Sequence, residues 1–282
     1  MSVDITQDLF SRVLSLNPLK LRTISATRYV TPLREGGSLP AIIEGDELGT
    51  YVLKFKGAGQ GPKVLISEII GGEVARALGL NVPELVFVEL DAKLGRNEPD
   101  YEIRELIKAS EGLNLGMDYL PGSITFDIVA DGRARQSVLT PEIAASIVWL
   151  DMFLTNVDRT ARNANMLVWH KKLWLIDHGA AMYFHHNWGD HRVQATKPFP
   201  MIKDHVLLPH VTPEMLRTVD ARAKVIVTMP LLHDLLELVP DDWLTHKSPH
   251  TDAGAARAAY LEYLMTRLDH SAPFVEEVLN AQ

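Results

Sequence analysis

Two carboxylates and one amide side chain lie close together around an apolar hairpin. Asp158 and Asn163 are separated by four residues, and Asp177 stands in the sequence Asp-His-Gly at the end of the hairpin. Phosphoryl transfer needs a carboxylate beside the acceptor hydroxyl, and it needs a second carboxylate and an amide oxygen to hold Mg²⁺ on the nucleotide phosphates. We therefore expect Asp158 to act as the base, and Asn163 and Asp177 to bind Mg²⁺.

The order of these residues is typical of a kinase catalytic loop, in which a D-x-G sequence follows the next hairpin. The hairpin itself is the apolar stretch 164–176, with Lys171 and Lys172 at its turn. His178 stands where many kinases have Phe, so the common protein-kinase sequence is not present. An Asp-x4-Asn pair or a D-x-G turn alone often occurs by chance. The prediction therefore depends on the hairpin between them and on the upstream chain.

Lys54 is the candidate phosphate-binding residue of the upstream chain, because it lies in an apolar strand. A buried ammonium needs an anion, and in a kinase its partners are the nucleotide phosphates and a Glu of the next helix. A helix is predicted over residues 64–78, and it carries Glu68 and Glu73, either of which could pair with Lys54. Strand alternation places Lys56 on the same face, so an edge-strand lysine that faces water remains the alternative.

Two further segments are candidate nucleotide-binding sites. The first is a turn between predicted strands, where backbone amides can approach phosphates. It consists of Gly36, Gly37 and Ser38. The second is the end of a strand before a Pro-Gly turn, where backbone amides would bind adenine as in a kinase hinge. It consists of Asp118, Tyr119 and Leu120. Two glycines in a hairpin turn usually form only a turn, so the first segment is the weaker signal.

Three histidines follow the D-x-G sequence, and with Asp190 they invite a metal-binding interpretation. They are His185, His186 and His191. No H-E-x-x-H helix surrounds them. We expect this segment to form a loop over the active site, and we expect no stoichiometric metal there without nucleotide.

Composition excludes several classes of protein. A formal net charge of −8 argues against a general nucleic-acid surface. The absence of Cys excludes disulfides and thiolate zinc sites and is compatible with a reducing cytoplasm. The N-terminal sequence is unlike a signal peptide, and no apolar stretch reaches about 18 residues. These features predict a cytoplasmic protein that does not bind a membrane.

The hydrophobic pattern changes along the chain from strands to helices, which predicts an α+β fold. Strands are expected over residues 24–30, 41–44, 50–55, 84–90 and 113–120. Helices are expected over residues 4–16, 64–78, 141–154, 213–224, 225–237 and 252–268, with Pro230 and Pro240 as interruptions. The polar stretch 91–111 has no clear pattern.

Residues 66–83 and 156–163 resemble the first helix and the catalytic loop of the HipA-like kinases, and the second segment also resembles phosphoinositide-3/4-kinases. The resemblance covers residues 20–270. It implies a two-lobed, protein-kinase-like fold, with a β-rich N-terminal lobe over 1–120 and a mainly helical C-terminal lobe over 121–282. It also implies that Lys54 contacts the phosphates of ATP with Glu68 as its helix partner. Ser38 then lies where HipA kinases can autophosphorylate.

Several features depart from the family. Thr160 stands where the family often has His, and the chain is too short for the additional N-terminal domain of full-length HipA. HipA kinases are bacterial Ser/Thr kinases, and the best-known member is a toxin whose partner is a DNA-binding antitoxin. Nothing in this sequence encodes that contact, so the resemblance does not imply the identity of the substrate.

The leading hypothesis is therefore an ATP- and Mg²⁺-dependent kinase of an unknown protein Ser/Thr hydroxyl, or of Ser38 itself, with no direct binding of nucleic acid. One alternative is a pseudokinase that binds nucleotide and serves as an interaction module. The retained Asp158, Asn163 and Asp177 argue against it, because binding alone needs no base. The other alternative is a kinase of a small molecule or a lipid head group.

Overall fold

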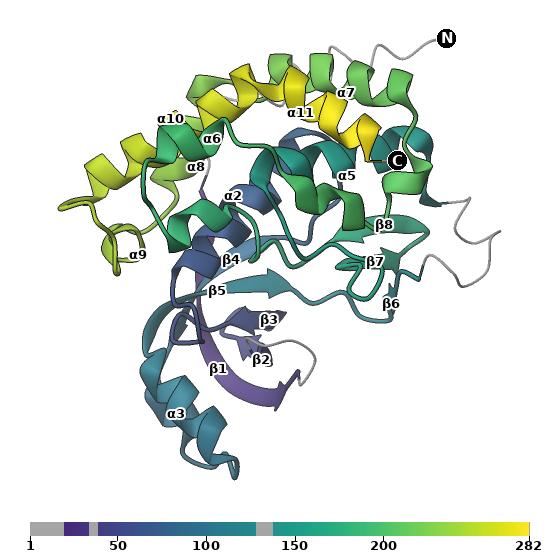
Figure 1. Cartoon of the computed structure of the whole chain (residues 1–282). Helices are drawn as coiled ribbons and strands as arrows, with labels where there is room; N and C mark the ends of the chain where they lie inside the picture. The colour runs from purple at the N-terminus through teal and green to yellow at the C-terminus, as the bar shows by residue number, and fades with distance from the viewer. Residues whose placement is uncertain (1–19, 34–38, 128–137, 282) are drawn as a thin grey trace.

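The structure is a computed structural model that describes residues 20–33, 39–127 and 138–281. The helix expected over residues 4–16 lies outside this part of the chain, and so do Gly36, Gly37 and Ser38. None of the described helices is both long and apolar enough to cross a membrane. The elements form a strand-rich part followed by a mainly helical part, which confirms the predicted fold class (Figure 1).

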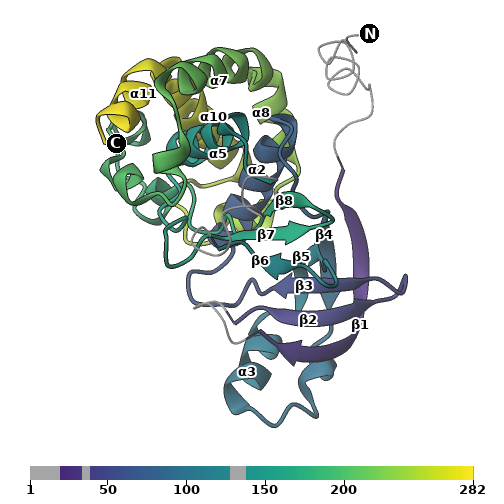
Figure 2. The same cartoon turned by 90° about the vertical axis from the view of Figure 1, so that its right-hand side faces the viewer.

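Five strands close into a small barrel in the strand-rich part (Figure 2). They are β1 (Arg22–Pro32), β2 (Ala41–Gly45), β3 (Thr50–Lys54), β4 (Leu85–Leu90) and β5 (Gly112–Asp118). The order around the barrel is β1-β2-β3-β5-β4, and β1 joins β4 in parallel whereas the other pairs are antiparallel. Buried side chains such as Ile24, Ile43 and Leu53 form its core.

The stretch 91–111, which has no clear pattern in the sequence, contains the short 3-10 helix η1 (Ala92–Gly95) and helix α3 (Tyr101–Ala109). The Asp100 carboxylate caps α3 by accepting a hydrogen bond from the Glu102 amide at 3.0 Å. Ile103 and Ile107 are buried in the barrel core. Two apolar residues one turn apart therefore pack this otherwise polar helix against the barrel.

Helix α2 (Lys63–Ala77) packs against the helical part, and most of its residues are buried. It ends in a glycine cap, as the sequence predicts. Gly79 has φ +85°, and the amide of Leu80 donates to the carbonyl of Ala75 at 3.0 Å. This is the bonding pattern of a Schellman cap, in which the left-handed residue is usually Gly.

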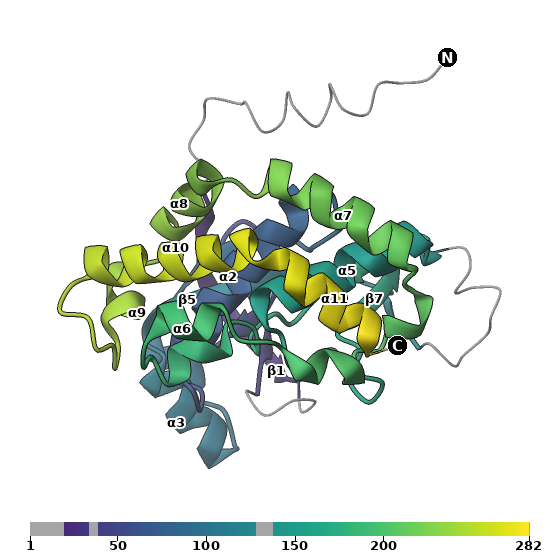
Figure 3. The same cartoon turned by 45° about the horizontal axis from the view of Figure 1, so that its top comes forward.

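Helix α5 (Pro141–Leu154) is the central helix of the helical part, and it is buried from Ala144 to its end. The other helices surround it directly or through one another (Figure 3). They are α6 (His191–Ala195), α7 (Pro213–Ile226), α8 (Met229–Glu237), α9 (Asp241–Thr245), α10 (Ala253–Asp269) and α11 (Ser271–Asn280). Three short 3-10 helices complete this part: η2 (Tyr183–His186), η3 (Pro200–Asp204) and η4 (Leu208–His210).

The helix expected over 225–237 is wrong at its beginning. Helix α7 continues to Ile226, and α8 starts at Met229 with Thr228 as its N-cap. Pro230 lies in the first turn of α8, where the absence of a backbone N–H costs nothing. Pro230 therefore begins a helix rather than interrupting one.

A three-stranded sheet carries the predicted hairpin. Its strands are β6 (Ile124–Thr125), β7 (Met166–Trp169) and β8 (Lys172–Leu175). His170 and Lys171 form the turn with φ of 47° and 59°, the left-handed conformation that tight hairpins require. The amide of Ile176 donates to the carbonyl of Asn165 at 3.1 Å, so the segments before β7 and after β8 lie side by side.

Candidate active site

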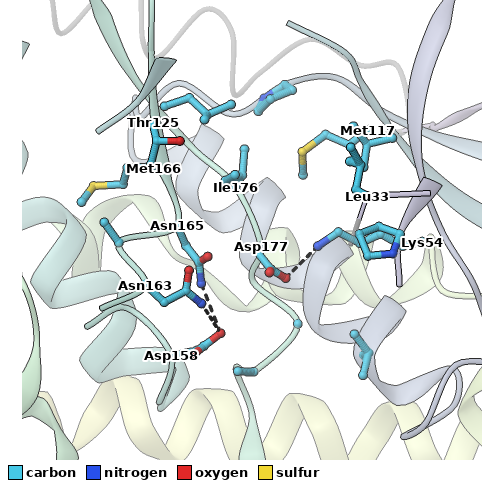
Figure 4. Close-up of a pocket in the computed structure, with 18 of the residues that line it drawn as sticks. Leu33, Lys54, Met117, Thr125, Asp158, Asn163, Asn165, Met166, Ile176 and Asp177 are labelled. Atoms are coloured by element: carbon cyan, nitrogen blue, oxygen red, sulfur yellow. Dashed lines mark hydrogen bonds and ion pairs between the residues drawn. The ribbon is translucent and has the colours of Figure 1, made fainter. Parts of the chain in front are cut away.

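The described residues enclose a cleft of about 1480 Å³ between the strand-rich part and the helical part. Lys54 and Met117 line one side, and Asp158 and Asn163 line the other, with Asp177 between them (Figure 4). Typical small-molecule sites have volumes of roughly 300–1,000 Å³. The cleft therefore has room for more than one reactant.

Lys54 lies at the end of β3, and two carboxylates share its ammonium group. Its Nζ donates to Glu68 Oε1 of α2, and to Asp177 Oδ1 at 2.8 Å. The other oxygen of Glu68 accepts a hydrogen bond from the His178 amide at 3.0 Å. Glu73, the other helix candidate, faces Arg76 instead. The structure thus brings together Lys54, Glu68 and Asp177, three residues that the sequence predicts for one site.

The charges of this group depend on one another. Burial acts to lower the pKa of Lys54, but Asp177 and Glu68 outweigh it and hold the pKa above its usual value. The charge of Lys54 holds the pKa of Asp177 well below its usual range. Burial raises the pKa of Glu68 to about 7, because Lys54 cannot fully compensate two carboxylates. Lys54 and Asp177 are therefore both ionised at neutral pH.

Asp158 follows α5 in the catalytic loop, which we define as residues 156–165. Its Oδ2 accepts hydrogen bonds from Asn163 Nδ2 at 2.9 Å and from Asn165 Nδ2 at 3.3 Å. Burial raises the pKa of Asp158 above its usual value. A carboxylate that is fixed in place and has a raised pKa is suited to accept a proton.

Asn165 is a site residue that the sequence analysis missed. It lies two residues after Asn163 and has φ 49°, a left-handed conformation in which Asn is enriched. The signal was an Asn-x-Asn sequence at the start of an apolar strand.

The donor set of the cleft fits a Mg²⁺ ion. The side-chain nitrogens of Asn163 and Asn165 both donate to Asp158, and their side-chain oxygens accept no hydrogen bond from the described residues. Asp177 supplies a carboxylate to the same cleft. Mg²⁺ prefers such oxygen ligands and is usually bound through one or two carboxylates together with substrate phosphates. The described residues contain no group of three His, Cys, Asp or Glu side chains that could hold a metal. The oxygen donors of the cleft therefore fit an ion that is shared with the phosphates of a nucleotide.

The predicted hinge residues all line the cleft, but two of their amides are engaged elsewhere. The amide of Asp118 donates to the Glu84 carbonyl at 2.8 Å, and that of Tyr119 donates to the Thr50 carbonyl at 3.0 Å. The Leu120 amide makes no backbone hydrogen bond within the described part of the chain. Of the three amides that were expected to bind adenine, only that of Leu120 is therefore available for a ligand.

The His178 side chain is buried as an apolar ring would be. It is 1% exposed, and neither ring nitrogen has a hydrogen-bond partner among the described residues. Burial lowers the pKa of His178 to about 3, so the imidazole is neutral. A Cβ atom at Gly71 would lie 2.7 Å from His178 Cβ, and one at Gly179 would lie 2.6 Å from Val64 Cγ1. Both glycines allow α2 to approach the Asp-His-Gly turn closely.

The expectation that the histidine-rich segment forms a loop over the active site is wrong. None of its three histidines lines the cleft. The His185 ring is buried and lies 2.9 Å from the Tyr260 hydroxyl, and His191 pairs with Glu262 at 2.9 Å, both on α10. The Phe184 ring also stacks on Tyr263 of α10. Burial of the aromatic side chains thus anchors the segment on α10, away from the cleft.

The fold resembles those of two kinases of known structure. A proinflammatory kinase of Helicobacter pylori, CtkA, is similar in structure, with a TM-score of 0.51, 12% sequence identity, and coverage of 92% of this chain and 98% of that one. The Golgi casein kinase has a TM-score of 0.48 and 12% identity, and covers 100% of this chain and 76% of its own. Its structure with Mn and ADP bound gives the same score and identity, with 98% of this chain covered.

A search of curated proteins gave no match. The likeness to CtkA shows a kinase-like fold. The family model of the HipA-like kinases matches residues 27–276, which is most of the sequence. The chain therefore belongs to the HipA-like kinase family.

Proposed function

We propose that this chain transfers the γ-phosphoryl group of ATP to a Ser or Thr hydroxyl of a protein, with Mg²⁺ bound between the nucleotide and the cleft. The observation that carries this proposal is the convergence of Lys54, Asp158, Asn163 and Asp177 on one cleft, from three separate segments of the chain. The family supports phosphoryl transfer.

The proposed reaction is a direct transfer. The acceptor oxygen forms a bond to the γ-phosphorus while the bond from that phosphorus to the bridging oxygen of ADP breaks. Asp158 accepts the hydroxyl proton, and its two Asn partners hold the carboxylate in place. Lys54 contacts the α- and β-phosphates. When bound through Asp177 and Asn163, Mg²⁺ neutralises phosphate charge.

The remaining nucleotide contacts follow from the edges of the cleft. We assign the adenine contact to the Leu120 amide, whereas Gly36, Gly37 and Ser38 are proposed to cover the phosphates. Leu33 and Pro40, which lie on either side of that segment, both line the cleft. Ser38 is accordingly proposed as a site of autophosphorylation.

Intact-mass spectrometry after incubation with ATP and Mg²⁺ tests the proposal. We expect phosphate on the wild type and on Asp234→Asn, an exposed control on α8. We expect none within the same incubation time on Asp158→Asn, whose rate should fall by roughly 10²–10⁴-fold. Asp158→Asn should still bind ATP, because Asp158 acts on the acceptor. Peptide mapping then tests Ser38. ATP binding with neither added phosphate nor ATP hydrolysis would favour the interaction module, because a kinase that lacks its protein acceptor can still hydrolyse ATP. Full transfer by Asp158→Asn would show that the base is misassigned.

A further inference from the structure

A buried carboxylate on α5 accepts hydrogen bonds from two residues of the catalytic loop. Asp151 has no exposed surface, and its Oδ2 accepts hydrogen bonds from Arg159 Nε at 2.5 Å and from His205 Nε2 at 2.9 Å. Its Oδ1 accepts from Asn156 Nδ2 at 2.8 Å. The carbonyl of Asn156's own side chain accepts from the Asp158 amide at 3.2 Å. We call Asp151, Arg159 and His205 the Asp151 hub.

Arg159 connects the hub with the far end of the catalytic loop. This side chain is 1% exposed, and its Nη1 donates to the Asn165 carbonyl at 2.7 Å. Asn165 is one of the two amides that hold the Asp158 carboxylate. Through Asn156 and Arg159, the hub therefore fixes the residues on both sides of Asp158.

His205 connects the hub with a second wall of the cleft. Its Nδ1 accepts a hydrogen bond from the Leu207 amide at 3.0 Å, so Nε2 carries the proton that is donated to Asp151. The neighbouring Val206 lines the cleft, and its amide donates to the Arg159 carbonyl at 3.1 Å. The catalytic loop and the cleft wall at Val206 are thus both attached to the buried carboxylate of Asp151.

A group of charges at this depth has a high cost unless it is fully paired. Asp151 accepts three hydrogen bonds, and Arg159 and His205 hold its pKa well below the usual range against the effect of burial. Apolar residues could have filled the same space. None of the three hub side chains lines the cleft, so the hub cannot contact the reactants and must act through residues that do.

We propose that Arg159 and His205 are positioning residues of the transfer reaction, which couple the cleft wall at Val206 to the orientation of Asp158 through Asp151. This inference rests on the proposed function. The hydrogen bond from His205 Nε2 to Asp151 is the link between the two segments. Its loss should misplace Asp158 while the Lys54 side of the cleft keeps its nucleotide contacts.

The two nitrogens of His205 can be tested separately. His205→Gln can place an amide N–H where Nε2 donates, and His205→Asn can place an amide oxygen where Nδ1 accepts. We expect His205→Gln to stay within a few-fold of the wild-type kcat for phosphate transfer. We expect His205→Asn and His205→Ala to lose on the order of 10- to 100-fold, as misplacement of a reacting group does, with the Kd for ATP unchanged.

A second arm separates positioning from general damage to the fold. In the Asp158→Asn background, His205→Ala should cause no further loss of the residual rate, because the effect passes through Asp158. Equal rates for the Gln, Asn and Ala variants, or an equal loss in both backgrounds, would overturn the proposal. Chemical denaturation of every variant shows whether a loss of rate only follows a loss of fold.

Hydrogen exchange at the Asp158 and Thr160 amides gives a readout that does not need activity. Exchange should be faster than in wild type in His205→Asn and remain slow in His205→Gln. A wild-type protein that turns over no ATP would refute the proposed function, and the exchange of the two variants would still decide whether the hub holds the loop. Equal exchange rates in His205→Asn and His205→Gln would overturn the proposal that the Asp151 hub holds the catalytic loop in place.

Discussion

Lys54 is the only lysine that lines the cleft among the described residues, and two carboxylates surround it. From residue types alone, Lys54 and Lys56 were equivalent, because both fall on the same face of a continuing strand. The structure separates them because β3 ends at Lys54, and the Lys56 amide donates to the Asn114 side chain at 2.9 Å. The point where a strand ends depends on its partner strands, which a local pattern does not contain.

We expect Lys54→Met to weaken ATP binding or the transition state by about 1–3 kcal/mol, the scale of a lost charge-assisted contact. The variant also leaves Glu68 buried without its cation. ATP titration and a transfer assay measure the effect. Lys56→Met is the matched control and should behave as wild type. The reverse result would assign the phosphate contact to Lys56.

Arg162 is the second cation of the cleft, and it has no acidic partner within the described part of the chain. The charge of Lys54 is already shared by two carboxylates, so Arg162 is the better placed to neutralise charge that develops on the transferred phosphoryl group. We expect Arg162→Ala to lower kcat by roughly 10- to 1,000-fold, as loss of one stabilising donor does, with ATP affinity changed much less. Arg162→Lys should recover part of the rate.

Arg217→Ala is the control for Arg162, because Arg217 lies on α7 in a surface pair with Glu276 at 2.9 Å. It should leave kcat unchanged. If Arg162→Ala raises the KM of a protein acceptor and leaves the rate of intrinsic ATP hydrolysis intact, Arg162 binds the acceptor rather than the phosphoryl group.

At the scale of elements, the sequence predicted the helices around the site almost to the residue. α2 begins and ends one residue earlier than expected, and α5 has the expected bounds. Both have a Pro or Gly signal at an end and a long apolar pattern. The catalytic loop between α5 and β7 was predicted only in part. Asp151 in an apolar helix was a signal that we did not use, since a buried carboxylate needs a cation such as Arg159.

Two adjacent glycines of α2 should respond differently to the same substitution by Ala. In Gly71→Ala the new Cβ meets His178 Cβ at 2.7 Å, next to the peptide backbone, so α2 and the Asp-His-Gly turn must separate. Overpacking of this kind costs about 1–3 kcal/mol of unfolding free energy. In Gly72→Ala the nearest atom is Leu85 Cδ1 at 3.1 Å, the end of a flexible side chain. The helix-propensity gain of up to about 1 kcal/mol should offset that contact.

Urea denaturation of the two variants measures the difference. Gly71→Ala should also slow transfer, because Asp177 is adjacent to His178, whereas Gly72→Ala should retain the wild-type rate. If both variants are equally destabilised, the close approach of His178 is not what requires glycine at position 71.

At the scale of the whole molecule, the order of strands followed by helices predicted the fold class, but not how the barrel closes. The closing pair is β1 with β4, in which Ile24 faces Val88. Such a distant parallel pairing leaves no local pattern. The histidine-rich segment was misplaced for a similar reason, since its partners Tyr260 and Glu262 lie far along the chain on α10. Contacts between segments that are distant in the sequence could therefore not be predicted from local sequence patterns.

That packing on α10 makes stability depend on pH. Burial lowers the pKa of His185 well below its usual value, so the ring stays neutral in the folded protein. The unfolded chain binds a proton at this residue below about pH 6.5, and the folded protein does not. Stability therefore falls as the pH drops below about 6.5, by about 1.4 kcal/mol per pH unit for each such histidine. His178, His186 and His250 act in the same direction.

His185→Asn removes this one contribution. Near pH 7.5 the variant should be less stable than wild type, because it loses the contact with Tyr260 and part of the packing around Phe184. Between pH 6 and 5 the wild type loses stability faster, so the difference between the two should shrink by about 1.4 kcal/mol per pH unit. Unfolding free energies from urea denaturation across this range measure the slopes. Parallel slopes would mean that His185 gains its proton in the folded protein, and that the ring is less enclosed by α10 than the structure shows.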